Sequence, residues 1–253
     1  MACGFALIIL GVLFLYAVQQ RGVRISQVDI FGGDAALSAI AKEALQGSYV
    51  GIVPRDSIFF YPEEDIRTRI MHADSDIATI SVFRKGLTGL TIKVTNRAPI
   101  ARWCGSVYEP RVGTSTPAVP CYVFDDAGRI YATTTALELV NRFALYTKLE
   151  PGVDPAGTLL PQAEQLPAAF NFARQLGTLG SPVDAVVIRD QEVDDHLESG
   201  TRVTYVLGQE QEAYTALMSG KSNINLADGS LEYLDLRFSG KMYLKRKSDT
   251  LKK

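Results

Sequence analysis

The sequence predicts an α+β protein with an N-terminal transmembrane helix, a small β-α-α-β-β domain and a larger, mixed but mainly antiparallel β domain with helices. Three observations predict this class. The chain begins with an uncharged apolar segment, helical and strand patterns alternate without a repeated strand–helix–strand series, and 47% of the 253 residues are hydrophobic. The expected divisions are 1–22 for the anchor, 23–98 for the small domain, 99–246 for the β domain and 247–253 for a basic tail.

The segment from Ala2 to Val18 contains no charged residue. Its length lies at the lower end of the roughly 17–25 residues that a membrane-spanning helix needs. A cleaved signal peptide is the alternative, but it would have a basic start and a small-x-small cleavage site, and neither is present. Arg21 and Arg24 follow the segment, and by the positive-inside rule alone they would place the body in the cytoplasm. A basic stretch upstream of Met1 would remove that conflict.

The small domain is expected to contain five elements. They are a strand over 23–31, a helix between Asp34 and Gly47, a second helix from Pro62, and strands over 77–84 and 90–94. Gly32 and Gly33 end the first strand, and Asp34 is placed to cap the helix that follows. Pro62, followed by two glutamates, suits the first turn of a helix.

The rest of the chain reads as strands and short helices. The expected elements are a hairpin over 122–131, a helix after Pro167, strands over 183–189 and 202–207, a helix over 210–219 and a last strand over 233–238. Residues 135–150 suit a helix and a strand equally. The acidic stretch over 190–198 fits no calcium loop, so we interpret it as a solvated loop between two strands rather than an acid–base or metal site.

No motif indicates catalysis. His72 and His196 lie far apart and outside any ligand-spaced pattern, and Gly220-Lys221-Ser222 lacks the earlier glycine of a phosphate-binding loop, where Thr215 stands. The net charge of −2 does not favour nucleic-acid binding, although the segment 241–253 alone carries six basic residues and one acid. We therefore expect a protein that is not an enzyme and has no cofactor, metal or small-molecule substrate.

Two cysteines are placed to form a disulfide. Cys104 follows one expected strand and Cys121 begins the next, with a segment rich in Gly, Pro, Ser and Thr between them that could loop out. A disulfide would favour an oxidising compartment outside the cytoplasm. The alternative is a pair of buried free thiols. Cys3 lies apart, in the apolar segment.

Three short motifs, in this order, resemble the bacterial cell-division proteins of the FtsQ/DivIB family. The first runs from Ile80-Ser81-Val82-Phe83-Arg84 through the strand over 90–94 to Asn96-Arg97-Ala98-Pro99, where Asn96 replaces the acid usual in the family. The second is the hairpin over 122–131, and the third is Leu234-Asp235-Leu236-Arg237-Phe238. The first domain then resembles a POTRA domain, and the resemblance covers roughly residues 24–246.

The resemblance implies a bitopic scaffold of the divisome. Such a protein would sit as a single-pass protein in the cytoplasmic membrane at the division septum, with its body outside the cytoplasm. It would link partners of FtsB and FtsL type to septal peptidoglycan synthesis. The resemblance assigns partner contact to Phe238, Ser239 and Gly240, with Tyr243 an approximate match to a later aromatic. Two alternatives remain: a POTRA-containing module of a protein-transport system, and an extracytoplasmic enzyme with an unrecognised site.

Overall fold

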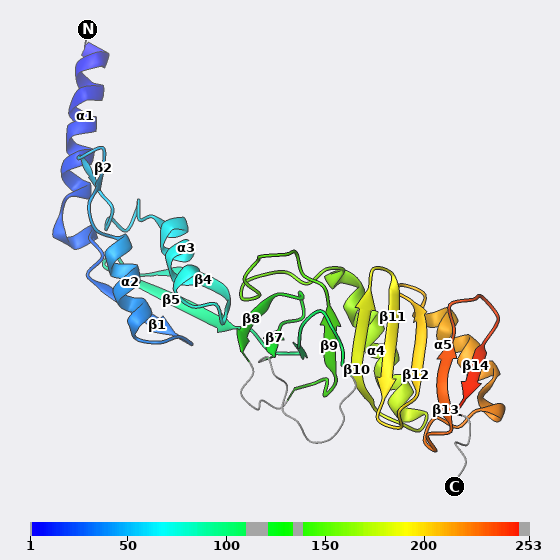
Figure 1. Ribbon diagram of the computed structural model, residues 1–253. Helices are drawn as coiled ribbons and strands as arrows, with labels where there is room; N and C mark the ends of the chain where they lie inside the picture. The colour runs from blue at the N-terminus through cyan, green and yellow to red at the C-terminus, as the bar shows by residue number, and fades with distance from the viewer. Residues whose placement is uncertain (1, 110–120, 134–138, 248–253) are drawn as a thin grey trace. The chain divides into compact units, whose positions relative to one another are not determined.

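The computed structural model describes residues 2–109, 121–133 and 139–247, with side chains from residue 9 onward. It divides the chain into two compact units, residues 1–97 and 98–253 (Figure 1). Unit 1 contains the apolar helix and the small domain, and unit 2 contains the β domain.

The expected transmembrane anchor is wrong. Helix α1 spans Ala2–Val18, which is 17 residues. At a rise of 1.5 Å per residue it extends about 26 Å, less than the roughly 30 Å of a bilayer's hydrocarbon core. Among the residues that the structure describes, none of the helices is both long and apolar enough to cross a membrane. Val18, the last residue of the helix, is buried, and a short 3-10 helix follows over Arg21–Val23.

The rest of unit 1 is a three-stranded sheet with two helices on one face. Its elements are β1 (Gln27–Phe31), α2 (Ala36–Ala44), β2 (Ser48–Tyr49), β3 (Val53–Pro54), α3 (Glu63–Ala73), β4 (Ile77–Lys85) and β5 (Gly89–Asn96). The strand order is β1-β5-β4, with β1 parallel and β4 antiparallel to β5. Apolar residues of α2, α3 and alternate strand positions form one core, among them Ala41, Ile66 and Ile92. The β2–β3 hairpin is an addition to the expected order.

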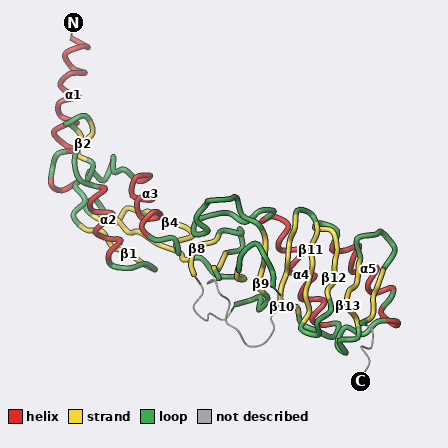
Figure 2. The backbone as a smooth tube through the Cα atoms, viewed as in Figure 1, coloured by secondary structure: helices red, strands yellow, loops and turns green. Residues whose placement is uncertain are grey.

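Unit 2 is built on one sheet of nine strands. Its elements are β6 (Ala101–Trp103), β7 (Tyr122–Phe124), β8 (Ile130–Thr133), β9 (Ala144–Thr147), α4 (Leu166–Thr178), β10 (Val183–Arg189), β11 (Glu192–Leu197), β12 (Arg202–Val206), α5 (Glu210–Ser219), β13 (Leu231–Asp235) and β14 (Tyr243–Arg246), with short 3-10 helices over 163–165 and 221–223. The strand order is β14-β13-β12-β11-β10-β9-β6-β7-β8, and five of its eight pairings are antiparallel (Figure 2).

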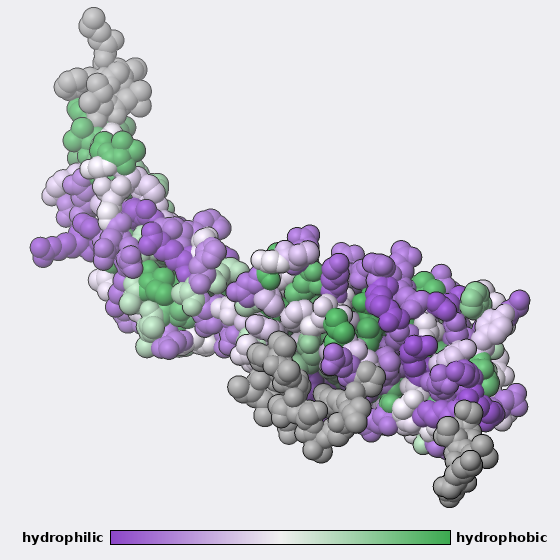
Figure 3. All heavy atoms as spheres, in the orientation of Figure 1, coloured by the Kyte–Doolittle hydropathy of each residue, from purple (hydrophilic) through white to green (hydrophobic). Residues whose placement is uncertain are grey.

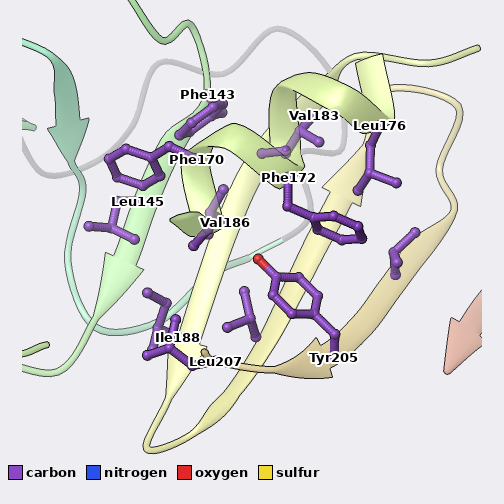
Figure 4. Packing of buried hydrophobic residues seen from close by; sticks show 14 of the residues in the cluster. Phe143, Leu145, Phe170, Phe172, Leu176, Val183, Val186, Ile188, Tyr205 and Leu207 are labelled. Carbon is purple, nitrogen blue, oxygen red and sulfur yellow. The ribbon is translucent and has the colours of Figure 1, made fainter. Parts of the chain in front are cut away.

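Helices α4 and α5 pack on one face of this sheet and share its core. Phe170 and Phe172 of α4 meet Phe143, Leu145 and Tyr205 from the strands (Figure 4). The ring centroids of Phe172 and Tyr205 lie 4.6 Å apart in an edge-to-face arrangement. Burial of these large rings contributes apolar contact area that holds α4 to the sheet.

The acidic stretch over 190–198 is a strand, and the interpretation of a solvated loop is wrong. Strand β11 lies in the sheet between β10 and β12. Asp194 and Asp195 are both buried, one on each face of the sheet. Backbone pairing on both sides therefore outweighs the low strand preference of aspartate.

A disulfide joins Cys104 and Cys121, which follow β6 and precede β7. The two strands pair in register, with Trp103 opposite Tyr122, so the cysteines come together where the strands open into the intervening segment. Residues 110–120 of that segment, and residues 134–138 of the ambiguous stretch, lie outside the described residues. The described end of that stretch is strand β9.

Candidate partner-binding edge of the nine-stranded sheet

Strand β14 stands at one end of the sheet, and its only neighbour among the described residues is β13 (Figure 1). All four of its residues are exposed. The sequence pattern placed the last strand at 233–238, whereas the structure ends β13 at Asp235 and adds β14 after a turn. An edge strand presents backbone groups that no strand of its own sheet has paired.

The direction of those backbone groups follows from one hydrogen bond. Lys247 donates its amide to the carbonyl of Ser230, with the N–O distance 2.9 Å, so this amide points toward β13. Leu231 and Arg246 stand opposite each other. Because neighbouring residues of an antiparallel strand alternate in direction, the amides of Arg246 and Leu244 point away from β13. They are the donors that an added strand would use.

An exposed aromatic pair lies beside this edge. Phe238 and Tyr243 are each 50% exposed, and their ring centroids lie 5.3 Å apart in an edge-to-face arrangement. The turn between them contains Ser239 and Gly240, with a positive φ of 68° at the glycine. Lys241 donates its amide to the carbonyl of Phe238 at 3.0 Å, which closes the turn and brings the two rings together.

The turn is held against helix α5. Met242 packs on the core cluster and lies so close to Gly220 that a Cβ there would meet the end of its side chain. Between the turn and the helix is a groove of about 410 Å³, lined by residues that include Thr215, Ser219 and Ser239. The edge strand, the aromatic pair and the groove therefore form one continuous surface, which we call the β14 edge.

Charged side chains on the adjoining sheet face are paired with each other. Arg237 binds Asp235 at 2.7 Å and also binds Glu192 of strand β11. The hydrogen bonds that Arg237 donates to the carboxylate of Asp235 lower the pKa of Asp235 and raise the pKa of Arg237. Lys245 of β14 pairs with Glu232 at 2.8 Å. These ion pairs fix the side chains that flank the edge, although each is exposed enough to contribute little stability.

A second polar site surrounds Asp194, on the face that the helices leave uncovered. Its carboxylate accepts a hydrogen bond from Thr204 at 2.5 Å and is paired with Arg189. The hollow there has a volume of about 260 Å³, and its charged lining consists of three arginines and three carboxylates: Arg189, Arg202, Arg237, Glu192, Asp194 and Asp235. Because these charges cancel, the hollow offers no net charge to a ligand.

Asp195 lies on the opposite, buried face of the same strand. Its side chain is fully buried, and neither carboxylate oxygen has a hydrogen-bond partner among the described residues. Burial raises its pKa well above the usual range, and the nearby charges of Asp194 and Glu210 raise it further. The hydroxyl of Tyr205 is also buried without a partner, inside the hydrophobic cluster (Figure 4). Burial raises the pKa of Tyr205 as well.

The two histidines have different settings. His196 stacks on Tyr108 with ring centroids 4.2 Å apart, and burial lowers its pKa. His72 is exposed near the end of α3. In the described parts of the chain, no group of three or more His, Cys, Asp or Glu side chains is arranged to hold a metal ion.

All four residues assigned to partner contact, Phe238, Ser239, Gly240 and Tyr243, lie in one turn and the strand that it starts. The sequence pattern missed β14 itself and its anchor Met242. The only signal for them was the apolar Met242 and Leu244 within a basic segment. No protein-family model and no curated protein matches the chain.

Proposed function

We propose that this chain is a non-catalytic scaffold of the bacterial divisome. Its β domain captures a partner of FtsB or FtsL type by adding a strand to β14, and through that partner it acts on septal wall synthesis. The observation that carries the proposal is the β14 edge, where a strand paired on one side only adjoins an exposed aromatic pair.

The chemistry of this edge suits protein binding without turnover. Strand addition obtains affinity from backbone hydrogen bonds, and side-chain pockets beside the strand supply specificity. Phe238 and Tyr243 are the type of aromatic anchors that dominate interface energies. The groove beside α5 gives a partner's side chain a place to enter.

The location proposed for both units is outside the cytoplasm. The disulfide between Cys104 and Cys121 supports it, because such bonds persist in oxidising compartments and are rare in the cytosol. The order of the motifs along the chain supports the family assignment. Neither argument depends on α1 crossing a membrane.

Photo-crosslinking in living cells tests the proposal. A photoreactive amino acid replaces Tyr243 in the full chain, and in a matched control it replaces Phe83, an equally exposed aromatic on β4 of unit 1. We expect position 243 to trap a small coiled-coil membrane protein of FtsB or FtsL type and position 83 not to trap it. Trapping of that protein at 83 alone would overturn the assignment of the edge. Trapping of an unrelated class of protein at 243 would overturn the divisome function.

A further inference from the structure

Unit 1 carries an apolar surface that its own fold does not cover. The turn between β2 and β3 places Val50 in water with 95% of its surface exposed, and Ile52 is half exposed. Val50 has a φ of 51°, in the left-handed region that β-branched residues rarely adopt. The fold thus holds an apolar side chain outward at the expense of backbone strain, and such strain clusters at functional sites.

Further apolar side chains adjoin this turn. Tyr49 flanks it, and Phe59 and Phe60 follow β3, all three exposed. We call Tyr49, Val50, Ile52, Phe59 and Phe60 the apolar tip. Its side chains are exposed at and near the end of the β2–β3 hairpin, where the chain itself leaves them in contact with water.

The apolar tip is continuous with helix α1. Phe60 meets Phe14 of the helix edge-to-face, with ring centroids 6.0 Å apart. Gln19 donates its side-chain amide to the carbonyl of Ile52 at 3.4 Å. Hydrophobic spheres gather where the helix meets the hairpin (Figure 3). Tip and helix end therefore present one surface.

Helix α1 shows which environment this surface suits. Its described side chains include six large apolar groups that are exposed: Ile9, Leu10, Val12, Leu13, Phe14 and Tyr16. The helix carries no charged residue on any side. A helix that is apolar all round is stable only where water is excluded, in a protein core or in lipid. Among the helix side chains that the structure describes, Val18 alone is buried.

Arginines and a tyrosine lie at the boundary of the surface. Arg24 and Arg55 are paired with Asp56 and Asp65, and Arg55 also lies over the ring of Tyr49 at 5.7 Å. Arg21 follows the helix, is exposed, and has no acid in ion-pair contact among the described residues. Tyrosine and arginine beside an apolar face are typical of segments that lie at the headgroup level of a bilayer.

We infer that the apolar tip inserts into the interfacial layer of a phospholipid bilayer beside α1, with Arg21 at the anionic headgroups. Contact of the apolar tip with lipid, added to that of α1, fixes how unit 1 is oriented on the membrane surface. Contact through α1 alone would leave unit 1 able to rotate about the helix axis. The inference does not require α1 to span the bilayer, and it is independent of the divisome proposal.

Vesicle partitioning of the full chain tests this inference. The variant Val50→Asp with Ile52→Asp is compared with a control in the same unit, Phe31→Asp with Phe83→Asp, whose side chains are each more than half exposed and lie on β1 and β4, outside the β2–β3 hairpin. Both add two negative charges. On vesicles of phosphatidylcholine with about one third phosphatidylglycerol, we expect the tip variant's partition coefficient to fall at least tenfold and the control's to change less than threefold. Equal losses, or no loss in the tip variant, would overturn the inference.

A depth measurement separates insertion from a simple charge effect. A tryptophan replaces Val50. The buried Trp103 of unit 2 also fluoresces, and its signal is measured in the wild-type chain and subtracted. We expect the added fluorescence to shift to shorter wavelength on vesicles and to be quenched by lipids brominated near the headgroup. If the added tryptophan stays solvent-exposed on bound vesicles, the tip is not in lipid, and a protein contact would be the better explanation of its exposure.

Discussion

Strands β11 and β14 have similarly polar sequences but opposite positions in the same sheet. Strand β11, Glu-Val-Asp-Asp-His-Leu, lies between two neighbours, and its two aspartates are buried. Strand β14, Tyr-Leu-Lys-Arg, has a neighbour on one side, and all its residues are exposed. The interior position of β11 makes Asp194 a structural residue, because Thr204 and Arg189 on the two neighbouring strands bind its carboxylate. End position leaves the backbone of β14 available to a partner.

The largest expected effect comes from blocking the outward backbone of β14. Arg246→Pro removes the amide that points away from β13, so an added strand loses its first donor and meets the proline ring. We expect partner capture to weaken by more than about a thousandfold, which corresponds to about 4 kcal/mol. Binding of the purified full chain to partner immobilised on a surface measures this change in affinity.

Arg246→Ala is the control for that variant, because it removes the side chain and keeps the outward amide. It should bind within about threefold of wild type. Equal weakening in both variants would mean that the side chain, and not the strand edge, makes the contact.

A change next to β6 and β7, in the part of the sheet far from β14, should lower the stability of the protein and leave partner binding unchanged. Cys104→Ser with Cys121→Ser opens the link between β6 and β7, which are six and seven strands away from β14 in the sheet order. Loss of a bridge closing a loop of this size lowers the free energy of unfolding by about 3 kcal/mol. Denaturant unfolding measures the change. Partner capture by the folded variant should be unchanged, and weakened capture would show that the two ends of the sheet are coupled.

The aromatic pair should give the next largest effect. Phe238→Ala and Tyr243→Ala each remove half of an exposed ring pair, so we expect each to weaken partner binding by about 2 kcal/mol, roughly thirtyfold, with little change in melting temperature. Phe31→Ala in unit 1, an equally exposed phenylalanine, is the matched control. If Phe31→Ala weakens binding and the edge variants do not, the partner surface lies on unit 1.

The smallest expected effect is a change in the pH dependence of stability, caused by Asp195 of strand β11. The folded-state pKa of Asp195 is raised above its unfolded value of about 3.9, so the folded chain holds a proton that the unfolded chain releases. The contribution of Asp195 to stability therefore falls as pH rises from about 4 to the folded-state pKa. Asp195→Asn should remove this dependence and raise the stability near pH 8. Unfolding free energies at several pH values test this, and an identical pH profile in both proteins would contradict it.

Local patterns were sufficient for most elements of unit 1. The strands over 77–84 and 90–94 and the helix from Pro62 correspond to β4, β5 and α3 within one or two residues, because turn residues and apolar alternation act locally. The first strand begins at Gln27 and not at Val23, since Arg24 forms a bridge to Ser57, a contact distant in sequence. The bounds of the apolar segment were also right, since α1 spans Ala2–Val18, but a helix of 17 residues is too short for the expected transmembrane span.

Unit 2 shows what local patterns miss. Strand β11 was missed because Asp194 is stabilised by Thr204 and Arg189 on the neighbouring strands, which the segment's own composition does not reveal. Strand β14 was missed because it depends on pairing with β13 and on Met242 packing beside Gly220. The sequence motif near Phe238 was sufficient to locate the candidate site. That this site lies at an open edge of the sheet could be seen only from the order of the strands.

Hydrogen exchange of the β14 amides tests the central claim most directly. The full chain is labelled in deuterated buffer with and without a purified partner of FtsB or FtsL type, and peptides covering 238–247 are compared with peptides covering β4. The account predicts slowed exchange at the outward amides of Leu244 and Arg246 when the partner is bound, with β4 unchanged. Protection confined to unit 1, or unaltered exchange in β14 under saturating partner, would contradict it.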